Sequence, residues 1–294
     1  MLEQGPLLNI HPILRYYAFD MNTPQPDVPR LAAETAAFIV AYKPASMHCA
    51  PLRQDEGGTL LDWCVKEYPE VALVRGRKPI EGGLLHRLDR ETAGLVLFAR
   101  TQEAYDSLAD QQDRGLFTKE YRARCVMNTG TPLPSGFPPI PADIVQDRRN
   151  LIDPDGNHPF KPFIIQSAFR HYGPGRTAVR PVLDIQEGGK RKSALDKGGF
   201  YATELLSFVQ SEGKAEEGSA VSIAVGLRRG FRHQVRCHLA WIGFPLVGDA
   251  LYGYAGDSDD ELGLSAESLS FLDPATGEPL RYAISSAKET ETSP

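Results

Sequence analysis

Cysteine and long apolar segments are both scarce in this sequence. Its 294 residues include only four cysteines, at positions 49, 64, 125 and 237, and no two of them form a C-x-x-C pair. A disulfide framework or a cysteine-based zinc site is therefore not expected, and each cysteine is interpreted as a small buried apolar residue. The longest apolar run, residues 36–42, is too short to cross a bilayer. Because the first residues also lack a secretory signal pattern, we expect a cytoplasmic protein without a membrane partner.

An overall excess of positive charge is missing too, since the formal net charge is −6. The imbalance comes from residues 257–294, which carry nine acidic and two basic side chains. The rest of the chain is nearly balanced, and residues 227–236 hold four arginines and no acidic residue. Contact with phosphates depends on local basic density, so the composition leaves a nucleic-acid partner open. A solvated basic face is the alternative interpretation.

Apolar periodicity and turn signals predict an α+β fold. Helices are expected at 59–67, 101–114 and 233–242, the first two beginning at threonine caps. Strands are expected at 36–42, 94–100, 119–127, 200–209, 220–227, 262–272 and 280–284. No regular βαβ order is present, so we expect a mixed, largely antiparallel β-sheet core flanked by helices and long loops.

Three regions are expected along the chain. Residues 1–30 show no clear periodicity and are interpreted as an N-terminal extension, and residues 286–294 as a polar, acidic tail. The span 31–285 is predicted to be one domain. Within it, residues 128–198 are rich in proline and glycine with few periodic segments, and they are predicted to form a loose insert.

The most unusual stretch is HRLDRETAG at residues 86–94, directly before a strongly apolar strand. Arginines flank Asp89, and adjacent positive charge favours an ionised carboxylate. Such a carboxylate can act as a nucleophile or as a general base. An exposed turn held by salt bridges is the alternative. A glycosidase pair of Asp89 and Glu91 would require a separation that the sequence does not give.

A second stretch of interest is RHQVR at residues 232–236. Arg232 and Arg236 are four residues apart on one helical face, which suits a phosphate or a carboxylate. His233 and His238 are possible metal ligands, but no partner cluster with ligand spacing accompanies them. We expect no metal site.

These stretches resemble motifs of the RluA-type pseudouridine synthases. HRLDRETAGL at 86–95 resembles the family signature H-R-L-D-R-x-T-S-G-L, with Ala93 in place of the usual serine. Further motifs occur in the family's order: YKPA at 42–45, KEYRA at 119–123, HQVRCHL at 233–239 followed by GFPLVGD and LYG, and LSF with TGE near 269–278. Five motifs in order are highly specific. The sequence RGFR at 229–232 departs from the T-G-R-T that commonly precedes H-Q in the family.

The resemblance implies a pseudouridine-synthase-like fold and isomerisation of uridine in structured RNA, either rRNA or tRNA. In that reaction the bond from uracil N1 to the ribose breaks and the base rejoins through C5. It implies that Asp89 is the catalytic aspartate, as nucleophile or base, that Tyr121 stacks beneath the uracil, and that Arg236 pairs with Asp89. We expect a monomer that needs neither a metal nor an organic cofactor and does not act on DNA. A catalytically silent RNA-binding protein on the same scaffold is the alternative.

The resemblance also implies where RNA lies. A uridine in a duplex must be extruded to reach a buried carboxylate, and Arg87 would fill its vacated place in the stack. Further RNA contacts are expected from His86, Arg90, Lys43, Arg232 and His233. We predict that the insert is an RNA-gripping arm, with Lys190, Arg191 and Lys192 among its basic groups. A loop that merely covers core surface is the alternative.

Overall fold

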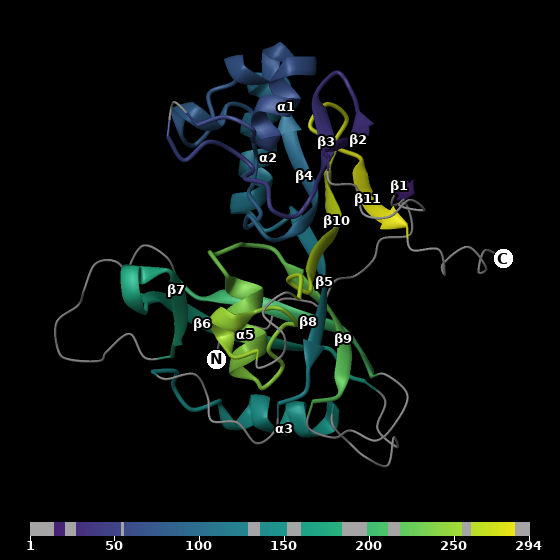
Figure 1. The fold of residues 1–294 in the computed structure, drawn as a ribbon. Coiled ribbons are helices and arrows are strands. Elements are labelled where there is room, and N and C mark those ends of the chain that lie inside the picture. Colours follow the sequence, from purple (N-terminus) through teal and green to yellow (C-terminus); the bar gives the residue numbers. More distant parts are fainter. Residues whose placement is uncertain are drawn as a thin grey trace.

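One continuous β-sheet organises the molecule (Figure 1). The computed structural model describes residues 15–20, 28–53, 56–128, 136–151, 160–183, 199–210, 218–254 and 260–285. Its strands are β1 (Arg15–Asp20), β2 (Arg30–Glu34), β3 (Phe38–Lys43), β4 (Ala93–Ala99), β5 (Thr118–Val126), β6 (Phe163–Tyr172), β7 (Ala178–Val182), β8 (Tyr201–Gln210), β9 (Ala220–Leu227), β10 (Leu264–Leu272) and β11 (Pro279–Ser285). They follow the order β2-β3-β4-β10-β5-β9-β8-β6-β7, with β11 beside β10 and β1 beside β11.

The pairing confirms the predicted mixed, largely antiparallel sheet of an α+β fold. Only β4 with β10 and β1 with β11 run parallel among the described strands. β3 and β4 are buried along their whole length, which explains why their sequences are almost continuously apolar. By contrast, β5 alternates between buried and partly exposed positions over most of its length.

Helices cover the sheet at α1 (Leu60–Glu67), α2 (Gln102–Asp113), α3 (Ala142–Leu151) and α5 (Gln234–Trp241). Thr59 caps α1 in a capping box with Asp62, and Thr101 caps α2 by accepting from the Ala104 N–H. Both caps confirm the predicted helix starts. No helix of the described residues is long and apolar enough to cross a membrane.

The sheet runs through two halves of the molecule, which meet where β5 pairs with β10. Figure 1 shows β2–β4, β10 and β11 with α1 and α2 in one half, and β6–β9 with α3 and α5 in the other. One of the apolar core clusters of the described residues spans both halves, with Val96 from the first and Ile165 and Leu239 from the second. Because the two halves share this core, their loops are held in a fixed relation where they meet.

The insert is more ordered than its composition indicated. It contains α3, β6 and β7, and β6 pairs with β8 within the main sheet, so the prediction of a loose segment is wrong for these residues. Residues 129–135, 152–159 and 184–198, which include Lys190, Arg191 and Lys192, lie outside the described residues.

The N-terminal extension also differs from the prediction. Residues 15–20 form β1 and pair in parallel with β11, so this part belongs to the sheet. Residues 1–14, 21–27 and the tail at 286–294 lie outside the described residues, and the domain boundaries remain a prediction.

Candidate active site

A cleft of about 1370 Å³ opens where the two halves meet. Its walls come from residues 84–92 in one half, residues 227–236 in the other, and β5 between them. Among the described residues that line it, nine are basic and four are acidic. The basic ones are Arg77, Lys78, Arg87, Arg90, Lys119, Arg228, Arg229, Arg232 and Arg236. This excess of cations in a concave surface suits a polyanion.

Asp89 lies in this cleft on the loop that leads into β4. Two backbone N–H groups of this loop are hydrogen-bonded, one before and one after Asp89. The Leu88 N–H donates to Cys49 Sγ at 3.2 Å, and the Thr92 N–H donates to the Asp89 carbonyl at 3.1 Å. The side chain of Asp89 keeps 27% of its surface exposed, so the carboxylate reaches the cleft from a fixed backbone.

Lys43 supports the same loop from beneath. Its side chain is fully buried, and Nζ donates to the carbonyls of Pro44, Met47 and Arg90 at 2.8, 2.8 and 3.1 Å. Burial lowers the pKa of Lys43 to about 8. The expectation that Lys43 contacts RNA does not agree with this position. The sequence pattern did not reveal that the ammonium is buried among backbone carbonyls.

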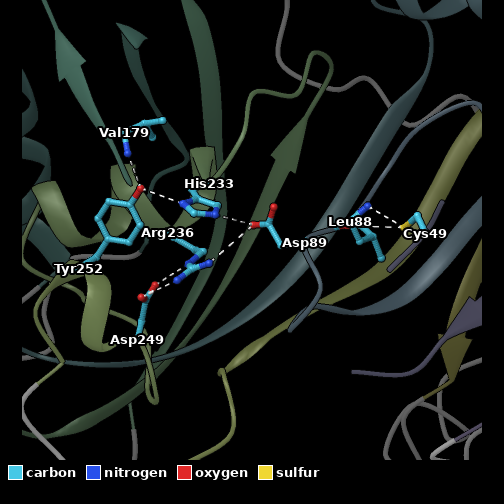
Figure 2. A network of polar contacts seen from close by, with 8 residues as sticks. All are labelled: Cys49, Leu88, Asp89, Val179, His233, Arg236, Asp249 and Tyr252. Atoms are coloured by element: carbon cyan, nitrogen blue, oxygen red, sulfur yellow. Dashed lines mark hydrogen bonds and ion pairs between the residues drawn. The ribbon is translucent and has the colours of Figure 1, made fainter. Parts of the chain in front are cut away.

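Two nitrogen donors face the same oxygen of Asp89 (Figure 2). Arg236 Nη1 and His233 Nε2 each lie 3.9 Å from Asp89 Oδ2. Burial raises the pKa of Asp89, and the nearby guanidinium of Arg236 only partly offsets this effect. The sequence shows the cations that flank Asp89 but not its burial, which has the larger effect on its pKa.

The hydrogen bonds of Arg236 go to a different carboxylate. Its Nε and Nη2 donate to the two oxygens of Asp249 at 2.7 and 2.8 Å, in a buried bidentate pair. Arg236 thus lies within ion-pair distance of Asp89, as the resemblance implied, but its hydrogen-bonded partner is Asp249. Asp249 belongs to the GFPLVGD motif, so its position was visible in the sequence while its partner was not.

His233 caps α5 in a left-handed backbone conformation, with φ at 54°. Its Nδ1 lies 3.1 Å from the hydroxyl oxygen of Tyr252, a buried residue that sequence reasoning did not select. Burial, together with the charges of Arg236 and Arg232, lowers the pKa of His233 to about 3. The imidazole is therefore neutral at physiological pH.

Tyr121 lies on β5, between β9 and β10, and lines the cleft with only 7% of its surface exposed. Burial and the charge of Asp89 raise the pKa of its hydroxyl. Lys119 points to the same side of β5, because it lies two residues earlier on the strand. Burial lowers the pKa of Lys119 to about 8.

The other residues expected at the site differ in their surroundings. Arg87 and Arg90 line the cleft with exposed side chains, and Arg87 also lies 3.2 Å from Glu81. Arg232 is exposed on the opposite wall. His86 is buried, packs against Phe117 and accepts a hydrogen bond from the Leu97 N–H, so most of its surface is turned to the core.

His238 does not meet His233 in a metal site. It is fully buried, with Ser167 and Thr203 hydroxyls 2.9 and 2.8 Å from its two ring nitrogens. In the part of the chain that the structure describes, no group of three or more His, Cys, Asp or Glu residues is placed to hold a metal ion.

Sequence comparison places these motifs among known proteins. The profile of the RNA pseudouridylate synthase family matches residues 37–241. An "Uncharacterized RNA pseudouridine synthase" from Chloroflexus aurantiacus is 30% identical over 213 residues, which cover 72% of this chain and 50% of that protein. "Ribosomal large subunit pseudouridine synthase D" from Xanthomonas campestris pv. campestris is 26% identical over 271 residues, covering 87% of this chain and 65% of that protein. The chain thus spans about half to two thirds of these relatives.

Solved structures agree on the fold. "Human RNA Pseudouridylate Synthase Domain Containing 1" superposes with a TM-score of 0.56 at 18% identity, covering 88% of this chain and 84% of that one. "Human RNA Pseudouridylate Synthase Domain Containing 4" gives 0.52 at 15% identity and covers 88% of both chains. The resemblance to RluA-type synthases is confirmed, and the chain belongs to the RNA pseudouridylate synthase family.

Proposed function

We propose that this chain is an RNA pseudouridine synthase that isomerises uridine in structured RNA. The observation that carries the proposal is the position of Asp89, a partly buried carboxylate on a fixed loop inside a basic cleft. Tyr121 lines the same cleft, and Arg236 and His233 lie beside the carboxylate. Family membership supports the same assignment.

The reaction is an isomerisation and needs no oxidant, reductant or second substrate. The bond from C1′ to N1 breaks and a bond from C1′ to C5 forms, while C5 loses a proton and N1 gains one. Asp89 either attacks the nucleotide or removes a proton from the sugar, and both roles require an ionised carboxylate with good basicity. A pKa raised by burial increases that basicity, provided the group remains ionised at the working pH.

Extrusion of the uridine brings the glycosidic bond to Asp89. Base flipping costs a few kcal/mol of stacking and pairing, and side chains that replace the lost stacking offset it. We infer that the guanidinium of Arg87 occupies the vacated position, which is supported by its half-exposed side chain two residues from Asp89. Tyr121 would offer its ring to the extruded base at the inner end of the cleft.

The names of the relatives support large-subunit ribosomal RNA as the substrate, since several are called "Ribosomal large subunit pseudouridine synthase D". Transfer RNA is the alternative. We infer that the protein works in the cytoplasm as a monomer, with RNA and not DNA as its partner. The cations of the cleft would contact phosphates, and Arg90 and Arg232 lie on opposite walls.

The test uses unmodified transcripts of large-subunit ribosomal RNA and of transfer RNAs. We expect the native protein to form pseudouridine at one or a few positions, as mapped by chemical labelling and primer extension. Asp89→Asn preserves the shape of the side chain and removes its charge, so activity should fall below about a hundredth of the native rate while RNA affinity stays within a few-fold.

Asp110→Asn is the matched control, because it removes an exposed carboxylate of α2 that does not line the cleft. This variant should keep the native rate. RNA binding without pseudouridine in either class of transcript would refute the proposal and favour a silent RNA-binding protein. Pseudouridine mapping of cellular RNA with and without the protein would then identify the modified uridine.

A further inference from the structure

A chain of polar contacts connects the insert to Asp89 (Figure 2). The Val179 N–H on β7 donates to the hydroxyl oxygen of Tyr252 at 2.9 Å. That oxygen lies 3.1 Å from His233 Nδ1, and His233 Nε2 lies 3.9 Å from Asp89 Oδ2. The four residues come from four separate segments of the sequence, so only the tertiary fold assembles them.

The direction of the protons in this chain follows from the donors available. The Tyr252 oxygen already accepts the Val179 N–H, so its own proton is free to be donated to His233 Nδ1. The reverse arrangement, with Nδ1–H donating, would leave the tyrosine proton without an acceptor among the described residues. A neutral imidazole that accepts at Nδ1 carries its hydrogen at Nε2, which faces Asp89.

Burial supports the same assignment. Tyr252 is 2% exposed, and burial raises the pKa of its hydroxyl, so it keeps its proton. The imidazole of His233 is neutral because it is buried and because Arg236 and Arg232 add positive potential around it. The aromatic ring of Tyr252 also meets the imidazole edge to face, with the ring centres 5.8 Å apart.

We propose that Val179 and Tyr252 lock His233 in the Nε2–H tautomer, and that His233 is a positioning residue that holds Oδ2 of Asp89 and leaves Oδ1 to the nucleotide. This proposal rests on the proposed function. Arg236 Nη1 approaches the same oxygen at the same distance, so two donors converge on Oδ2. Catalytic hydrogen bonds are often long in a free enzyme, and we expect both contacts to shorten when the nucleotide binds.

A neutral donor has a specific advantage beside this carboxylate. An imidazolium would add a positive charge next to Asp89 and reduce its basicity. The neutral Nε2–H orients the carboxylate without that charge. His233 has a left-handed backbone conformation, and backbone of this kind is concentrated at functional sites.

The tautomer is measurable in the free protein. Long-range ¹H–¹⁵N spectra of histidine-labelled protein distinguish Nε2–H, Nδ1–H and imidazolium, and His233→Gln assigns the signals. We expect His233 to remain the neutral Nε2–H tautomer from about pH 5 to 8. In Tyr252→Phe, which keeps the ring and removes the hydroxyl, this preference should be lost. An Nδ1–H or imidazolium signal in the native protein would overturn the proposal.

Kinetics test the positioning role with a matched pair, His233→Gln and His233→Met. Both side chains are unbranched and share the left-handed backbone, but only glutamine supplies an N–H near the Nε2 position. On the large-subunit transcript, His233→Met should lower kcat about ten- to a hundred-fold, and His233→Gln should retain most of it. KM should stay within about two-fold in both, because His233 acts through Asp89.

Equal kcat values for these two variants, or a loss confined to KM, would contradict the positioning role. Tyr252→Phe should lower kcat and leave KM unchanged, and a native kcat in that variant would likewise overturn the proposal. A native protein that forms no pseudouridine refutes the proposed function instead. The tautomer spectra need no turnover, so they still decide the hydrogen-bond assignment in that case.

Discussion

The buried pair of Arg236 and Asp249 allows a quantitative prediction of the free energy of unfolding. Both groups are buried, the carboxylate completely, and two hydrogen bonds join them. Asp249→Asn keeps the shape of the side chain but replaces one acceptor oxygen with an amide that faces an arginine N–H. A buried guanidinium is then left without its compensating charge.

Breaking a buried ion pair from one side costs about 3–5 kcal/mol of unfolding free energy. For a chain of this size that loss corresponds to a fall in Tm of roughly 6–20 °C. A second consequence concerns Asp89, because Arg236 Nη1 already lies 3.9 Å from it. Released from Asp249, the guanidinium should turn to Asp89 and lower the pKa of that carboxyl, so kcat should fall even where the variant is fully folded.

Urea unfolding and single-turnover rates, both measured well below the Tm, separate the two effects. The control is Asp110→Asn, which breaks the pair with Arg114 on the surface, where both side chains are more than half exposed. That change should cost less than about 1 kcal/mol. The double variant Arg236→Met with Asp249→Leu should regain most of the lost stability and remain inactive. A cost for Asp249→Asn no larger than that of the surface control would refute the reasoning.

Three further predictions concern other parts of the molecule. Gly94→Ala should cost several kcal/mol by urea unfolding, because φ is +133° and the added Cβ would lie 2.2 Å from the Ala266 carbonyl oxygen; Gly277→Ala, with φ at +74° and open space, should cost only about 1 kcal/mol. His238 has a folded pKa of about 3 against 6.5 unfolded, so the unfolded chain binds the extra proton and stability falls as the pH drops below 6.5. Between pH 7 and 5 the unfolding free energy of the native protein should fall by about 2 kcal/mol more than that of His238→Gln. Equal decreases in the two proteins would contradict the lowered pKa of the buried His238. Replacing residues 190–192 with alanine should flatten the salt dependence of RNA binding by roughly one unit of slope per phosphate contact, and an unchanged slope would exclude a gripping role for this cluster.

Local signals explain which elements the sequence predicted well. Thr59 and Thr101 fixed two helix starts because capping depends on residues within one turn. β9 was predicted with its observed bounds, since a short apolar segment between turns is itself a local pattern. β6 was missed because prolines and glycines flank it. Its order comes from pairing with β8, more than thirty residues later in the chain.

The site shows the same division between local and tertiary information. The motifs indicated Asp89 and Tyr121, and the fold places both in one cleft. The hydrogen-bonded partner of Arg236 could not be predicted, because both Asp89 and Asp249 lie near its guanidinium and only the folded distances show that the hydrogen bonds go to Asp249. Lys43 was expected to contact RNA for a related reason, since a motif does not specify whether its ammonium faces a cleft or backbone carbonyls.

The arrangement around Asp89 reconciles two electrostatic requirements of the proposed reaction. RNA phosphates require a cleft rich in cations, whereas a carboxylate that attacks or removes a proton loses basicity when cations surround it. Asp249 compensates the arginine nearest to Asp89, and His233 is neutral, so neither adds an uncompensated charge beside it. The exposed arginines Arg90 and Arg232 lie elsewhere along the cleft walls, where they can contact phosphates. Asp249 and Tyr252, which touch the two neighbours of Asp89 and not Asp89 itself, are thus as necessary to the proposed chemistry as the groups that meet the nucleotide.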